Sequence, residues 1–426
     1  MTHDSALTHT PLATEIAADP ALLDGLAHLA VHVGLNLQAG QDLVMTTPSS
    51  AMPLARAITA EAYRAGAGLV TTLVSDRDMT LARFRHARDD SFDKAPDWLY
   101  EGMAKAYENG AARLALVGED PFLLAQEEAA KVGRANRANA AAYRPALAPI
   151  AGFHINWSII PCPTLDWAQR MFPDQPPQDA FEQLAQAIRK TARLDHADPV
   201  AAWTAHNAEL ARRCQMLNTA RFDSLHFQAP GTDLHVGLAD GHFWQGGASV
   251  ARNGVRCNPN IPTEEVFTTP HAARVDGYVR ATKPLSHQGT LIDEIEMRFE
   301  AGRAVEARAT RGGDVLRDML ATDDGAARLG EVALVPHSSP VAQSGHLFFN
   351  TLFDENAASH IAMGQCYASC FEGGDTLSKD EVSARGGNDS LIHVDWMIGS
   401  DRMDVDGLHV DGSRVALMRA GEWVTP

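Results

Sequence analysis

Three residues near the C-terminus are of the types that bind metal ions in enzymes: His360, His393 and Asp395. His393 and Asp395 alternate with apolar residues in IHVDW, a pattern that predicts a β-strand. Residues two apart in a strand share a face, so both side chains should point to one side while their apolar neighbours pack on the other. Imidazole and carboxylate groups together are suited to zinc, cobalt or manganese.

The segment 357–367, which contains His360, is predicted to be a helix. Polar residues just before it can cap its start, and a glycine pair at 373–374 ends the region. In such a helix His360, Gly364 and Tyr367 recur at i, i+4 and i+7, which is one face. We therefore expect Tyr367 to lie beside whatever His360 binds, with the glycine leaving room between them.

Two glutamates further upstream lie in short strand-like runs. Glu265 is part of NIPTEEVFTTP, which is bounded by prolines, and Glu331 follows Gly330 in the alternating run GEVALVP. A carboxylate in an apolar strand is costly to bury unless it is paired or bound to a metal. From spacing alone, either Glu264 or Glu265 can face inward.

Four motifs, in the order PTEEVFTTP, LGEVALVP, NTLFDENAASH and HVDWMIGS, resemble the aminopeptidase T family (M29) of thermophilic-type metallo-aminopeptidases. The resemblance extends from about residue 20 to Pro426 and is dense from Phe227 onward. It implies an active-site tyrosine at Tyr367 and a homodimer with enclosed active sites. The five metal ligands that it implies are Glu265, Glu331, His360, His393 and Asp395.

Five ligands are too many for one tetrahedral zinc ion, which takes about four. Two histidines and three carboxylates suit a pair of divalent ions, about 3.5–4 Å apart, that share a carboxylate and activate water. We therefore expect two ions of zinc, cobalt or manganese per chain. Glu331 could bridge the ions or take the proton of the water, and the sequence leaves both roles open. Tyr367 could donate a hydrogen bond to the tetrahedral oxyanion.

An alternative function is that of a mononuclear, ring-cleaving iron dioxygenase of the dihydroxypyridine type, which resembles this family in fold. Two histidines and Asp395 alone would form the facial triad of such a non-haem iron site. A mononuclear site does not need Glu265 and Glu331, so the presence of both favours the peptidase. A non-catalytic peptide-binding protein on the same fold would be expected to have lost a ligand, and none is lost.

Other polar residues in this part of the chain are interpreted as structural. Asp354 and Glu355 are interpreted as residues at the start of a helix rather than as ligands. Asp233 and His235 alternate in the same way as a metal-binding pair, but we interpret them as part of a strand.

Composition limits the possible partners and the compartment. Lys plus Arg number 36 and Asp plus Glu number 54, a net charge of −18 that argues against nucleic-acid or anionic-membrane partners. The chain has neither a signal-peptide pattern nor an apolar run of membrane-spanning length. Five scattered cysteines fit a reducing compartment, and Cys366 and Cys370 are interpreted as buried core residues. We expect a cytoplasmic enzyme that acts on short peptides.

The elements that must position these residues fall into two predicted domains. Strand-like and helical runs alternate over residues 20–222, which predicts an α/β domain with a largely parallel sheet. No glycine-rich phosphate loop follows its first strand, so we expect this domain to be architectural. Short strands with glycine-containing turns over residues 223–426 predict a β-rich α+β domain that carries the metal site. Residues 1–19 are expected to form a flexible leader.

Overall fold

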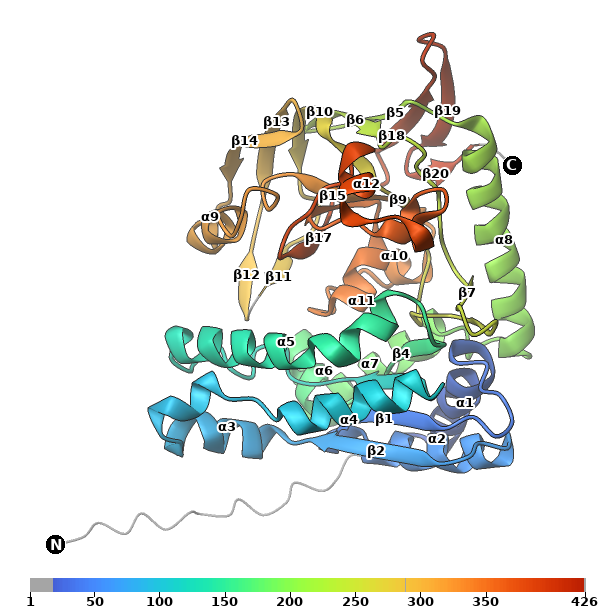
Figure 1. Cartoon of the computed structure of the whole chain (residues 1–426), viewed down its shortest axis with the longest axis vertical. Helices are drawn as coiled ribbons and strands as arrows, with labels where there is room; N and C mark the ends of the chain where they lie inside the picture. Colours follow the sequence, from blue (N-terminus) through green and yellow to red (C-terminus); the bar gives the residue numbers. More distant parts are fainter. Residues whose placement is uncertain (1–17, 288, 425–426) are drawn as a thin grey trace, which may run out of the picture.

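The first half of the chain builds a parallel sheet covered by helices, seen below the rest of the molecule in Figure 1. This computed structural model describes residues 18–287 and 289–424, so most of the predicted leader lies outside the described residues. The strands, in the order β2-β1-β3-β4, are β1 (Leu43–Pro48), β2 (Val70–Ser75), β3 (Ala112–Val117) and β4 (Trp157–Pro161). The helices are α1 (Pro20–Leu29), α2 (Met52–Arg64), α3 (Arg77–His86), α4 (Asp97–Glu108), α5 (Ala129–Ala151), α6 (Leu165–Met171) and α7 (Pro177–Thr191).

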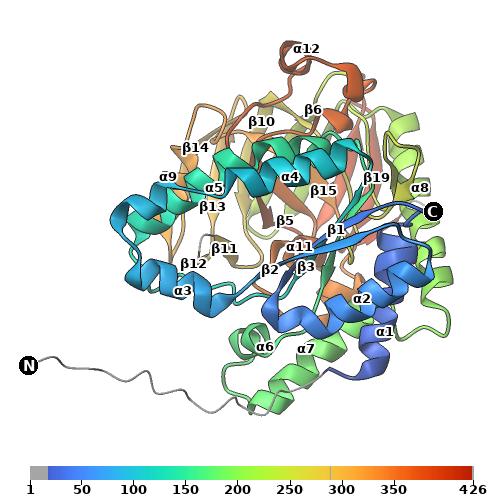
Figure 2. The ribbon, with the colours of Figure 1, turned by 60° about the horizontal axis from the view of Figure 1, so that its bottom comes forward.

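Both faces of this sheet are covered, because successive side chains of β1 point to opposite sides. Leu43 and Met45 pack into one apolar core, and Val44 packs into another with Met103 of α4 and Ile150 of α5. Figure 2 shows α4 and α5 on one face of the sheet and α1 and α2 on the other. The parallel α/β arrangement predicted from the sequence is therefore confirmed.

The long helix α8 (Pro199–Ala220) runs beside both halves of the molecule (Figure 1). Its start is capped by Asp198, whose carboxylate accepts a hydrogen bond from the backbone N–H of Ala201 at 3.0 Å. Trp203 of α8 packs into the core of the first half, whereas Leu210 and Leu217 pack into that of the second. One helix thus fixes the two cores to each other.

The second half contains an eight-stranded and a four-stranded antiparallel sheet, as the short strands predicted. The larger has the order β14-β13-β10-β6-β5-β18-β19-β20. Its strands are β5 (Ser224–Ala229), β6 (Thr232–Leu238), β10 (Pro270–Arg280), β13 (Glu296–Glu300), β14 (Arg303–Arg308), β18 (Asp404–Leu408), β19 (Arg414–Arg419) and β20 (Glu422–Trp423). The smaller, β17-β16-β15-β9, consists of β9 (Val266–Thr268), β15 (Leu329–Leu334), β16 (His360–Gly364) and β17 (His393–Met397). Side chains from both sheets share one apolar core.

Shorter elements connect these sheets. Two hairpins pair β7 (Ser249–Val250) with β8 (Arg256–Cys257) and β11 (Leu285–His287) with β12 (Thr290–Ile292). The helices of this half are α9 (Gly313–Leu320), α10 (Pro340–Ser344), α11 (Thr351–Asp354) and α12 (Lys379–Ala384). Phe348 and Phe353 pack into the core of the first half, so the segment around α11 links the halves a second time.

The predicted helix at 357–367 is wrong. His360–Gly364 form strand β16, paired on both sides, and Tyr367 lies in the loop that follows. Alanine and methionine favour a helix locally, but pairing with β15 and β17 overrides that weak preference. Gly364 has φ 103°, a conformation outside the helical region, so a helix cannot continue through this position.

The long helix α5 continues to Ala151 past two internal prolines, Pro145 and Pro149. None of the described helices is both long enough and apolar enough to cross a membrane. All five cysteines are buried and free, which agrees with the interpretation of Cys366 and Cys370 as buried core residues.

Candidate metal centre

The small antiparallel sheet brings the five predicted ligands together. Glu331 is on β15, His360 is on β16, and His393 and Asp395 are on β17. Glu265 immediately precedes β9 at the edge of this sheet, rather than lying within the strand as the sequence predicted. Residues far apart along the chain therefore become neighbours through strand pairing.

Small residues on the central strand leave room for this cluster. Ala362 of β16 lies directly opposite Glu331 on one side and Asp395 on the other. Gly364, two residues on and so on the same face, lies opposite His393. A Cβ atom at Gly364 would lie 2.2 Å from the carbonyl oxygen of Ile392. A side chain at Gly364 would therefore collide with the backbone just before β17, and the expected role of Gly364 in leaving room between His360 and Tyr367 stays a prediction.

A β-bulge at Gly330 turns Glu331 toward the site. Leu329 pairs with Met363, but Glu331 pairs with the preceding residue, Ala362, so the register shifts between them. Without the extra residue, Leu329 and Glu331 would share a face. With it, Leu329 packs into the apolar core, and Glu331 faces the other ligands. A Cβ at Gly330 would lie 2.2 Å from the carbonyl oxygen of Gln365, so only glycine fits there.

Backbone carbonyl groups orient both histidine rings. The Nδ1 atom of His360 lies 3.1 Å from the carbonyl oxygen of Ala358, and that of His393 lies 2.7 Å from the carbonyl oxygen of Gln365. Since a carbonyl only accepts, each neutral ring donates its proton from Nδ1, and Nε2 keeps a free lone pair. This is the arrangement in which protein histidines bind metal ions.

The ligand atoms form two groups that share Glu331. His360 Nε2 lies 3.1 Å from Glu265 Oε2 and 3.5 Å from Glu331 Oε1. His393 Nε2 lies 3.7 Å from Glu331 Oε2 and 3.4 Å from Asp395 Oδ1. Each group of three thus contributes two carboxylates and one imidazole, and the two oxygens of Glu331 face different groups.

The chemistry of the five candidate ligands is suited to binding metal ions. Three ligand atoms are buried and have no hydrogen-bond partner among the described residues: Glu265 Oε2, His360 Nε2 and Asp395 Oδ1. Leaving such atoms unpaired is costly, and a divalent cation would satisfy them. Burial raises the pKa of Glu331 to about 7, despite His360, and the nearby Asp395 adds to the shift. A cluster of carboxylates this short of positive charge is suited to cations.

Glu355, interpreted from the sequence as a residue at the start of a helix, is a further carboxylate beside the proposed ligands. It opens the 3-10 turn Glu355–Ala357 after α11, close to its predicted place at a helix start, but it lines the cleft beside the ligands. Burial raises its pKa well above the ordinary value, and the charges of Glu265 and Asp395 raise it further. The available signal was an acidic residue five positions before His360, within a motif that already carried the family resemblance.

Its neighbour Asp354 is structural, as predicted. The buried Asp354 carboxylate accepts hydrogen bonds from the backbone N–H groups of Phe348 at 2.8 Å and Asn350 at 3.0 Å. The helix at 357–367 that Asp354 was expected to start does not form, and Asp354 is instead the last residue of α11, which is capped by Asn350. The two adjacent acids therefore have different surroundings.

A family model for thermophilic metalloproteases (M29) matches residues 20–423. The chain belongs to the M29 family. Aminopeptidase T of Thermus thermophilus is 54% identical over 402 residues, covering 94% of this chain and 98% of that protein. Aminopeptidase 2 of Geobacillus stearothermophilus is 45% identical over 401 residues, covering 94% and 97%. These matches confirm the prediction of a metallo-aminopeptidase.

Comparison of folds leads to the same M29 family. The solved structure of wild-type AmpT from Thermus thermophilus has a TM-score of 0.90 and 52% sequence identity, covering 95% of this chain and 99% of that one. A 2,5-dihydroxypyridine dioxygenase from Pseudomonas putida KT2440 has a TM-score of 0.51 at 14% identity, covering 95% and 97%. The second likeness shows the fold alone.

A cleft of about 840 Å³ opens onto the candidate metal centre. Glu265, Glu331 and His393 line it, and Phe153 and Trp157 of the first half contribute to its wall. Tyr367 also lines it and is 43% exposed. Desolvation and the charges of neighbouring carboxylates raise the pKa of Tyr367 well above its ordinary value, so its hydroxyl group keeps its proton.

Proposed function

We propose that this M29 metallo-aminopeptidase removes N-terminal residues from short peptides with two divalent ions per chain. The ions are zinc, cobalt or manganese, and they are held by Glu265, Glu331, His360, His393 and Asp395. The observation that carries the proposal is the division of these ligands into two groups of three that share Glu331. A single ion would leave several of these buried groups without a partner.

The chain's own residues have separate tasks in this proposal. When bound, a pair of divalent ions lowers the pKa of water and polarises a carbonyl group. Glu331 faces both ligand groups, which supports a role for it as a ligand to the ions or as the group that would take a proton from the attacking water. Tyr367 keeps its hydroxyl proton and lines the cleft beside His393, and both features support its role as a hydrogen-bond donor to the oxyanion.

The size and walls of the cleft are consistent with the proposal that the substrates are short peptides. Its volume of about 840 Å³ is within the usual range of about 300–1,000 Å³ for small-ligand sites. Residues of the α/β half contribute to its wall, which gives that half an architectural role in limiting access. We further propose a homodimer that encloses the site and a cytoplasmic location, in keeping with five free cysteines.

A metal count on the purified protein, combined with a panel of aminoacyl substrates, tests this function. We expect two divalent ions per chain at this five-ligand centre and release of the N-terminal residue from dipeptides and tripeptides. N-terminally acetylated peptides should resist cleavage, because an aminopeptidase requires a free α-amine. One tightly held iron per chain, with oxygen consumption on dihydroxylated aromatic compounds, would overturn the proposal.

The dioxygenase alternative has less support. His360, His393 and Asp395 could form a facial triad, but Glu265 and Glu331 each lie within 3.5 Å of His360. A mononuclear iron site of that type keeps coordination positions open for oxygen and substrate. Two additional buried carboxylates would compete for those positions.

A further inference from the structure

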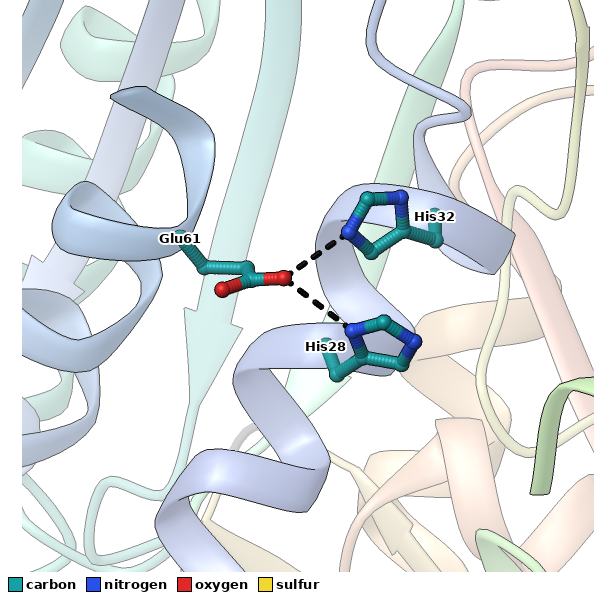
Figure 3. Close-up of side chains that lie close together, drawn as sticks. All are labelled: His28, His32 and Glu61. Carbon is teal, nitrogen blue, oxygen red and sulfur yellow. Dashed lines mark hydrogen bonds and ion pairs between the residues drawn. The ribbon is translucent and has the colours of Figure 1, made fainter. Parts of the chain in front are cut away.

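A second group of metal-binding side chains lies on the surface of the α/β half, outside the cleft. His28 on α1, His32 in the π-helical turn Ala30–Gly34 that continues it, and Glu61 on α2 converge there. Figure 3 shows both imidazole rings directed at the same carboxylate. His28 Nδ1 lies 3.0 Å and His32 Nε2 lies 2.8 Å from the same oxygen, Glu61 Oε1.

The local sequence explains why the two rings meet. HLAVH places the histidines at i and i+4 of a helix, the spacing at which paired histidines of helical zinc sites share a face. The ring centroids are 4.3 Å apart and tilted by 44°. Leu29 and Val31 between them are buried in the core, which fixes the face that the histidines present. Single π-helical turns of this kind occur frequently at functional sites.

The second carboxylate oxygen has its own partner. Arg64 donates a hydrogen bond from Nε to Glu61 Oε2 at 2.8 Å, three residues along α2. This contact holds the carboxylate plane while Oε1 remains directed at the histidines. Because Arg64 engages only Oε2, it does not occupy the point at which the two rings converge.

A comparable group, His226, Asp233 and His235, differs in a decisive way. The rings of His226 and His235 are stacked at 3.8 Å with an interplanar angle of 10°. Nitrogen lone pairs lie in the ring plane, so parallel stacked rings cannot both point at one ion between them. Arg414 also approaches, with Nη1 3.3 Å from His226 Nδ1. This group therefore remains a strand feature, as Asp233 and His235 were interpreted from the sequence.

We propose that His28, His32 and Glu61 form a second, surface metal site that binds a late transition ion such as Zn²⁺, Ni²⁺ or Cu²⁺. Two imidazoles and one carboxylate are the ligands that such ions prefer over calcium or magnesium. Each ring binds through the nitrogen that faces Glu61 and keeps its remaining proton on the other nitrogen. The side chains of His28 and His32 are 51% and 38% exposed, so water completes the coordination.

The change in geometry on binding is small. Bonds of about 2.0–2.1 Å in a tetrahedral site separate ligand atoms by about 3.3 Å. The present separations of 2.8 and 3.0 Å are those of hydrogen bonds, so each ring needs to move by only a few tenths of an ångström. Bound in this way, the ion links α1 to α2. The site has no acid or base placed for hydrolysis, since Leu29 follows His28 where a helical zinc protease has glutamate.

Equilibrium dialysis of the full-length protein against Zn²⁺, followed by a metal count, tests the proposal. The His28→Gln/His32→Gln double variant should bind one ion fewer per chain than the wild type, with unchanged peptidase activity. Loading with Cu²⁺ should give an electron paramagnetic resonance signal with coupling to two nitrogens that the double variant lacks. These readouts concern the surface site, so failure of the proposed peptidase function would not affect them.

A matched control removes two other exposed histidines, as His86→Gln/His196→Gln. This control should bind as many ions as the wild type. If the double variant at 28 and 32 proves unstable, Glu61→Gln provides a second test, because it removes the only anionic ligand and should lose the same ion. Equal ion counts in the wild type and in a folded variant would overturn the proposal and leave an ordinary hydrogen-bonded cluster.

Discussion

The ring of Tyr367 lies 4.6 Å from that of His393, measured between centroids. The first is in the loop after β16 and the second begins β17, so strand pairing rather than a shared helix brings them together. The phenol ring of Tyr367 therefore lies next to one of the proposed metal ligands.

Replacing Tyr367 with phenylalanine should lower kcat about 10²–10³-fold, or about 3–4 kcal/mol, which is the usual cost of losing one oxyanion donor. KM should change little, because such a donor acts mainly in the transition state. Metal content, measured by mass spectrometry, should stay at the wild-type level. Full activity, or activity lost only together with metal, would assign Tyr367 to packing.

His360→Ala should reduce the metal content, because His360 is buried and its Nε2 lies within 3.5 Å of both Glu265 and Glu331. The matched control is His242→Ala, which removes another buried histidine, one whose Nδ1 lies 3.0 Å from the carbonyl oxygen of Ala239. Only the first substitution should change the ion count at the active centre. Equal counts in both variants would remove His360 from the ligand set.

Chelation should abolish activity and lower Tm, because removal of the ions leaves a cluster of buried carboxylates without compensating charge. Adding zinc, cobalt or manganese should restore both, since an ion at 100 times its Kd stabilises the folded state by about 2.7 kcal/mol. Calorimetry and a peptidase assay on the same samples measure the two effects. An apoenzyme as active as the untreated protein would contradict metal dependence.

Glu355→Gln and Asp354→Asn should have different consequences, although the residues are adjacent. The first should affect catalysis, and the second should affect stability. Glu355 lines the cleft beside the proposed ligands, so its amide variant should lower kcat/KM while Tm changes little. Asp354 holds two backbone N–H groups, so Asp354→Asn should lower Tm. A Glu355 variant with wild-type kinetics would limit that residue to a structural role.

His206 should make the fold sensitive to acid. Burial, with the positive charge of Arg193, lowers the pKa of His206 to about 3, and its Nε2 donates to the carbonyl oxygen of Thr263 at 2.7 Å. The folded state therefore keeps this ring neutral, whereas the unfolded chain takes up a proton below about pH 6.5. The stability that it contributes is complete above pH 6.5 and is lost progressively as the pH falls toward 3.

Urea unfolding at pH 7 and pH 5 measures this contribution. The wild type should lose about 2 kcal/mol more than His206→Gln between these pH values, from about 1.4 kcal/mol per pH unit. Glutamine can still donate to the Thr263 carbonyl, so the variant should fold. An equal loss in both proteins would show that other groups cause the acid sensitivity.

The sequence alone was sufficient to identify the candidate metal ligands and to predict how some of them are arranged. Alternation in IHVDW predicted that His393 and Asp395 share a strand face, and the structure brings them within 3.4 Å of each other. The parallel α/β half was also predictable, because strands buried on both faces leave continuous apolar runs. Both features are local, so neighbouring residues are sufficient to indicate them.

Only the tertiary structure decided how the remaining residues meet. The segment carrying His360 has helical residues but becomes the central strand between β15 and β17, because pairing on both sides outweighs weak local propensity. The bulge that turns Glu331 into the site depends on a register shift relative to Met363 and Ala362, which are distant in sequence. Likewise, HLAVH predicts two histidines on one helix face, but the packing of α2 against α1 supplies Glu61.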